Sequence, residues 1–221
     1  MPLNKDLFSS MEKIPKSTII KWVLFLAAVY ALYDGVYEYA DSKRLMLDMA
    51  DVTSGLMPII AMHIDLPLVV GAVLVCLIFD RRQFFSVLAI RSMGQMVWMV
   101  VGALIFVGAV YLKEPASSVD VYEIVHALIV VGFVEELLFR GFFFSWLDRA
   151  GCGKLAYLLS GLAWGASFGI RSIVVNGTST FMAVLPMAIV GAALGIVAAV
   201  VYKKCNSLWL VAYLHGVISL L

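Results

Sequence analysis

Long apolar stretches separated by short charged segments constrain the fold of this chain more than any other feature of its sequence. An α-helix needs about 20 apolar residues to cross about 30 Å of hydrocarbon, and it satisfies its backbone hydrogen bonds internally. Apolar residues make up 63% of the 221 residues and charged residues 14%, whereas soluble domains are about 45–50% apolar and about 25% charged. The sequence therefore predicts an integral membrane protein with an all-α fold.

Seven apolar stretches are candidate spans, which predicts a polytopic transmembrane helix bundle of about seven helices. The second stretch contains Pro58 and Pro67 and should be kinked or partly interfacial, and the last is short for a full crossing. The predicted spans are residues 18–37, 54–79, 92–112, 121–147, 155–175, 181–202 and 206–221.

The distribution of lysine and arginine predicts the orientation of the chain, because short cytoplasmic loops carry an excess of these residues. Eleven of them lie on the side of the N-terminus and only four in the alternate loops. We therefore expect the N-terminus in the cytoplasm, and a chain of this size favours the bacterial inner (plasma) membrane. The apolar run 22–32 could belong to a signal peptide, but no small-x-small cleavage site precedes the acidic segment after Asp34, so we expect an uncleaved anchor.

Two further patterns are interpreted structurally. The acidic segment 34–51 could be a ligand surface, but its interspersed charges favour a solvated amphipathic helix. Gly161, Gly165 and Gly169 recur every four residues, and Gly191 and Gly195 form a second small-xxx-small pair. Such spacing lets transmembrane helices approach closely, so these glycines are predicted to serve helix packing.

Three ionisable residues lie inside the fourth predicted span, where an ionisable group is costly unless it is paired or faces a cavity. Glu136 and Arg140 are four residues apart and share a helix face, so they are predicted to form an ion pair. Glu135 points about 100° away from Glu136 and is not part of this ion pair. Its position suits a general base. The alternative is a purely structural polar cluster of the three residues, but an unpaired second carboxylate would add cost to such a cluster without stabilising it.

Depth in the membrane indicates which polar residues could meet Glu135. With a rise of about 1.5 Å per residue, Glu135 lies about 18 Å, Phe168 about 20 Å and His215 about 14 Å from the cytoplasmic ends of their helices. The fourth, fifth and seventh spans could therefore share a cavity. His215 is either a functional group or a histidine bonded to a neighbouring carbonyl, and Ser219 follows one turn later.

The other histidines are assigned to the membrane surface. His126 lies about 180° around the helix from Glu135 and should be interfacial. His63 and Asp65 could line a cavity, but interfacial solvation is favoured.

Several classes of function lack their sequence signature. There is no His-Glu-x-x-His motif, no Gly-x-Ser-x-Gly elbow and no phosphate-binding loop, so no metal and no cofactor are predicted. The three cysteines indicate neither a disulfide framework nor a metal site. A net charge of +1 gives no reason to expect nucleic-acid binding. A transporter would need internal repeats or polar residues along a path, and neither is seen.

The motif Glu135-Glu136-x-x-x-Arg140-Gly141 inside an apolar helix resembles that of the CPBP family. This family, also called Abi, comprises CAAX-type proteases and bacteriocin-processing or immunity proteins. The resemblance covers about residues 118–221, after a cytoplasmic segment 1–17 and a region of three spans at 18–117. It implies that Glu135 is the general base, that Glu136 and Arg140 support it, and that His215 stabilises an oxyanion.

The two other family motifs are altered here. Phe168 stands where a histidine is expected, an alternative register ends at Ser172, and Ser219 stands in place of an asparagine. A phenyl ring cannot accept a proton, whereas a hydroxyl can still donate a hydrogen bond. The resemblance therefore implies either an intramembrane glutamic endopeptidase or a non-catalytic regulatory or immunity protein. In both cases its partner would be a membrane-embedded or lipidated peptide or protein in the lipid bilayer.

Overall fold

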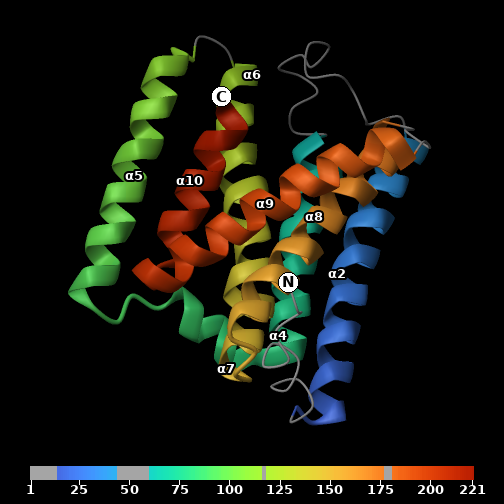
Figure 1. The fold of residues 1–221 in the computed structure, drawn as a ribbon. Helices are drawn as coiled ribbons and strands as arrows, with labels where there is room; N and C mark the ends of the chain where they lie inside the picture. Colours follow the sequence, from blue (N-terminus) through green and yellow to red (C-terminus); the bar gives the residue numbers. More distant parts are fainter. Residues whose placement is uncertain (1–13, 44–59, 116–117, 177–180) are drawn as a thin grey trace.

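The chain folds into one bundle in which most helices run up and down and the helix of residues 181–205 crosses them obliquely (Figure 1). The computed structural model describes residues 14–43, 60–115, 118–176 and 181–221, and these contain no β-strand. They form seven helical rods. These are α2 (Lys16–Ser42), η3 (Ala61–Asp65) continued by α4 (Leu66–Leu88), α5 (Met93–Lys113), a composite central helix, α8 (Lys154–Asn176), α9 (Phe181–Cys205) and α10 (Leu208–Leu220).

Among the described residues, four helices are long and apolar enough to cross a membrane, which confirms the predicted transmembrane bundle. They cover Lys16–Ala40, His63–Leu88, Met93–Lys113 and Val184–Cys205, and α10 is a shorter apolar helix, as expected. Many large apolar side chains lie exposed on α5 and α9, as lipid-facing helices require. Of the expected amphipathic helix, only the part up to Ser42 falls in α2, and residues 44–51 lie outside the described residues.

The helix of the second span breaks directly after its predicted end at residue 79. Although α4 is assigned as far as Leu88, the segment beyond the break is a further short helix joined to the span across a kink. The break in helical geometry falls at Asp80, whose φ of −162° and ψ of 84° are extended. Pro67 causes no break because it lies in the first turn of α4, where its missing N–H is not needed. Pro58 lies outside the described residues.

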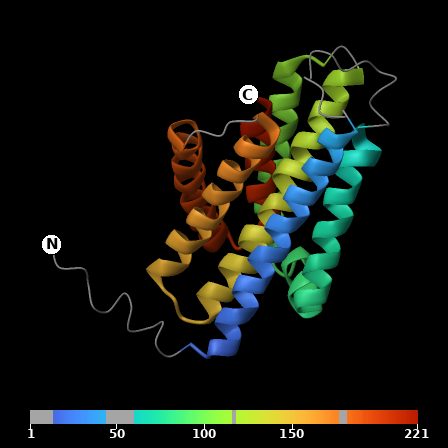
Figure 2. The same cartoon turned by 90° about the vertical axis from the view of Figure 1, so that its right-hand side faces the viewer.

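The central helix comprises α6 (Ser118–His126), η4 (Ala127–Val134), η5 (Leu137–Phe144) and α7 (Ser145–Arg149). The segments η4 and η5 are π-helical, with hydrogen bonds from residue i to i+5, and Glu135 and Glu136 lie between them. Every residue from Val134 to Phe144 is buried. The central helix contacts α4, α8, α9 and α10 (Figure 2), so its polar residues lie inside protein rather than in lipid.

Glycines bring α8 and α9 into backbone contact, which confirms the packing predicted for the two glycine patterns. A Cβ atom added at Gly195 would lie 2.9 Å from Gly161 Cα, and one added at Gly191 would lie 3.1 Å from Gly165 Cα. The two helices therefore meet glycine against glycine along their crossing.

Candidate active site

The central helix places three ionisable side chains in the interior of the bundle. Arg140 Nη1 lies 3.2 Å from Glu136 Oε1, and neither side chain is exposed. This is the ion pair predicted from the i, i+4 spacing. Glu135 is 5% exposed and points to a different set of neighbours. The separation of the two carboxylates into different surroundings therefore agrees with the expected difference in direction.

Helix α10 brings His215 against both carboxylates. Its Nδ1 lies 2.9 Å from Glu136 Oε1, and its Nε2 lies 4.0 Å from Glu135 Oε2. Close approach of α10 to the central helix depends on two glycines: a Cβ at Gly216 would lie 3.1 Å from Ala127 O, and one at Gly132 would lie 3.3 Å from the Gly216 nitrogen. The imidazole thus bridges the glutamates, and its closer contact is with Glu136 rather than with the expected Glu135.

Trp164 of α8 is a site residue that the sequence analysis did not select. Its indole Nε1 donates a hydrogen bond of 2.7 Å to Glu135 Oε2. The guanidinium of Arg140 stacks over the same indole ring at 4.4 Å, and the His215 ring meets it edge to face at 4.9 Å. Trp164 therefore contacts three of the four ionisable members of the site. One signal was available in the sequence: Trp164 lies four residues before Phe168, and the family resemblance implies an aromatic residue at this position in a motif aromatic-x-x-x-His.

Helix α9 also contributes to the site, through its backbone. Arg140 Nη2 donates a hydrogen bond of 3.2 Å to the carbonyl oxygen of Gly195. The α8–α9 contact brings this carbonyl within reach, because Gly161 and Gly195 keep the two backbones close. The guanidinium is thus held on three sides, by a carboxylate, an indole and a carbonyl, as a fully buried cation requires.

Phe168 and Ser219, the two positions at which the family motifs are altered, differ in their distance from the site and in their burial. Phe168 packs edge to face on Trp164, with ring centroids 4.8 Å apart, so it lies one helical turn from the indole that holds Glu135. Ser219 follows His215 by one turn of α10 but is exposed. The side chain of Ser172 lies outside the described residues. The structure thus places Phe168 beside the site and gives Ser219 no buried position within it.

The remaining histidines lie apart from this cluster. His126 Nδ1 lies 3.0 Å from Asp65 Oδ1, both side chains being partly buried, and His63 belongs to the π-helical turn η3. Within the described ranges, no three His, Cys, Asp or Glu side chains are grouped so that they could hold a metal ion. The candidate active site is therefore the cluster of Glu135, Glu136, Arg140, His215 and Trp164, referred to below as the Glu135 cluster.

The Glu135 cluster combines the groups that hydrolysis of an amide requires. One carboxylate, Glu135, is held by an indole N–H and faces an imidazole, whereas the other, Glu136, is neutralised by Arg140. A carboxylate that accepts a proton from water and an imidazole that donates a hydrogen bond to an oxyanion are the functional parts of such a site.

Residues 115–221 match the family model of the Rce1-like type II CAAX prenyl endopeptidases. The match confirms the family resemblance drawn from the glutamate motif, and it contains the whole Glu135 cluster. Neither a curated protein nor a solved structure matches the chain.

Proposed function

Because residues 115–221 belong to the Rce1-like CAAX protease family, we propose that this integral membrane protein is an intramembrane glutamic endopeptidase that cuts a membrane-associated, lipidated peptide. The observation that carries the proposal is the position of Glu135. Its carboxylate faces His215 Nε2 across 4.0 Å inside the bundle, while Glu136 is occupied by Arg140. The two glutamates thus have the different surroundings that two different roles require.

The proposed reaction begins with a water molecule bound at the Glu135 carboxylate. Glu135 takes a proton from this water as the hydroxide adds to the carbonyl carbon of the scissile peptide bond. The oxyanion that forms accepts a hydrogen bond from His215, and the Glu136 carboxylate, 2.9 Å from His215 Nδ1, orients the imidazole ring. Glu135 then returns the proton to the leaving nitrogen, and the C–N bond breaks to give a carboxylic acid and an amine.

Trp164 would support the reaction by orienting the base. Its hydrogen bond to Glu135 Oε2 fixes one carboxylate oxygen. A fixed carboxylate loses less entropy when the reacting groups come together.

A second candidate is a non-catalytic relative that binds membrane peptides or proteins in a regulatory or bacteriocin-immunity role. Phe168 favours it, because a phenyl ring stands beside Trp164 where the family resemblance implies a histidine. Loss of one acid–base group costs about 10²–10⁴ in rate. A binding protein would need only the surfaces of the helices around Glu135 and not proton transfer at its carboxylate.

The experiment that separates the two candidates measures cleavage of a farnesylated reporter peptide by the purified protein. Glu135→Gln keeps the size of the side chain but cannot accept a proton, so cleavage should fall by about 10²–10⁴. Glu123→Gln is the matched control, because Glu123 lies on the same central helix but pairs with Lys113 outside the Glu135 cluster. Full cleavage by Glu135→Gln would exclude the proposed role of this residue.

The variant Phe168→His tests whether restoring the histidine that the family resemblance implies increases activity. It places an imidazole one turn from Trp164, and in an endopeptidase it should raise the rate of cleavage. If the unmodified protein and Phe168→His both bind the peptide without cutting it, the binding function takes the place of the catalytic one.

A further inference from the structure

A polar hollow of about 250 Å³ lies at the end of the bundle where α4 ends and α5 begins. It is bordered by the last turns of the central helix and by the junction of α9 and α10. Ten of its thirteen lining residues are polar. A polar hollow at the end of membrane-spanning helices is placed to receive a polar group at headgroup depth, and it is separate from the Glu135 cluster. We call it the interfacial hollow.

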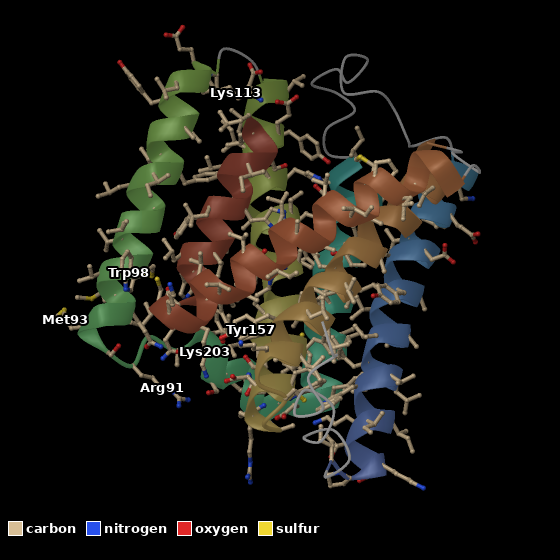
Figure 3. The ribbon with its side chains drawn as sticks, viewed as in Figure 1. Arg91, Met93, Trp98, Lys113, Tyr157 and Lys203 are labelled. Atoms are coloured by element: carbon tan, nitrogen blue, oxygen red, sulfur yellow. The ribbon has the colours of Figure 1, made fainter. Side chains whose placement is uncertain are left out.

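The interfacial hollow carries an excess of positive charge. Arg91, Arg149 and Lys203 line it against a single carboxylate, Asp148, which pairs with Lys203. Figure 3 shows Arg91 and Lys203 at the same end of the bundle, opposite the end that carries Lys113. Arg149 is anchored through Nε, which donates to Ser145 O at 3.2 Å. The lining therefore has a formal charge of +2 and two guanidinium groups, which are suited to bind phosphate oxygens.

Two hydrogen bonds connect lining residues of the hollow with the part of the central helix that carries Arg140. Gln83 Nε2 donates to Gly141 O at 2.6 Å, and Ser145 Oγ donates to Arg140 O at 2.9 Å. Both donors belong to lining residues, and both acceptors lie in the π-helical segment η5. The floor of the hollow is thus held to the backbone at Arg140 itself.

We propose that the interfacial hollow binds the phosphate of an anionic phospholipid headgroup. The membrane surface supplies this ligand at the depth where the hollow lies, and anionic lipids attract basic groups there. Binding would hold the end of α4, the central helix and the α9–α10 junction together. The inference does not depend on the proposed function, because it concerns different residues and a different ligand.

The test titrates the purified full-length protein in a neutral detergent with short-chain phosphatidylglycerol or phosphatidylcholine of equal chain length. Bound lipid is counted by native mass spectrometry. Phosphatidylglycerol should bind about tenfold more tightly than phosphatidylcholine, and Arg91→Gln with Arg149→Gln should remove most of this preference. Arg82→Gln is the matched control: Arg82 is an exposed cation of α4 that does not line the hollow.

A second variant keeps the test valid if the arginine variants fail to fold. Ser86→Asp adds a carboxylate to the lining without removing a hydrogen bond that we describe, and it should also abolish the preference. The proposal is overturned if the double arginine variant keeps the preference, or if Arg82→Gln loses as much of it. It is also overturned if inorganic phosphate at the same concentration displaces the lipid, because the site would then bind a free anion.

Discussion

The contact between α8 and α9 leads to a quantitative prediction for Gly165→Ala. The added methyl group would lie 2.8 Å from the Ala192 nitrogen and 2.9 Å from Ala192 Cβ. Neither atom can rotate away, since one belongs to the backbone and the other is fixed to it. The two helices must therefore separate or shift along each other.

The cost follows from this geometry. Overpacking of a close contact costs about 1–3 kcal/mol, and for a chain of this size each kcal/mol lowers the midpoint of thermal unfolding by about 2–4 °C. A destabilisation of about 2 kcal/mol should thus lower the midpoint by about 4–8 °C. Gly165→Leu should cost more, because its longer side chain cannot fit between the helices.

The assay is thermal unfolding in detergent, compared with a glycine that has no close neighbour. Gly108 lies on α5 with nothing within 4 Å of an added Cβ. Because alanine favours a helix over glycine by about 1 kcal/mol, Gly108→Ala should leave the midpoint unchanged or raise it. Equal midpoints for the two alanine variants would refute the glycine contact as the reason for the close crossing.

Four further predictions can be checked separately. A reporter fused after Lys203 should be cytoplasmic and one near Asp41 external, and reversed labelling would refute the orientation. Activity should withstand a chelator, whereas inhibition restored by zinc would contradict a metal-free site. Trp164→Phe keeps the ring but removes the N–H donor to Glu135; a hydrogen bond to a charged group contributes about 1.5–3 kcal/mol, so kcat should fall about tenfold or more, and an unchanged kcat would exclude the positioning role. Burial raises the pKa of the Cys152 thiol, so its alkylation should require a higher pH than that of a free thiol, and alkylation at the ordinary pH would contradict its burial.

The parts of the site that the sequence predicts are those set by local geometry and by depth. The i, i+4 spacing places Arg140 on Glu136 whatever surrounds the helix. The depth of His215 brings it to the level of Glu135 because both helices cross the same slab of hydrocarbon. The depth of a residue does not determine how its helix is rotated about its own axis. The closer contact of the imidazole with Glu136 could therefore not be derived from the sequence.

Other features depend on how helices cross. The hydrogen bond from Trp164 to Glu135 depends on how α8 crosses the central helix. The hydrogen bond from Arg140 to the Gly195 carbonyl depends on how α9 crosses it. The short helix that follows the break at Asp80 was also not predicted from hydropathy. At this break the carboxylate of Asp80 accepts hydrogen bonds from the Gln83 backbone N–H, at the start of the following helix, and from Trp146.

Because the central helix contains π-helical segments, the number of its residues determines where the side chains of the site point. A π-turn holds more residues than an α-turn, so the direction of Glu135 depends on the number of residues in Ala127–Val134. Deleting one of them would allow an ordinary α-helix with the same hydropathy and an intact Glu-Glu-x-x-x-Arg motif. The glutamates would nevertheless turn away from His215. Among related sequences, the number of residues before the motif should therefore distinguish proteins that form the site from proteins that have the motif without the geometry of the site.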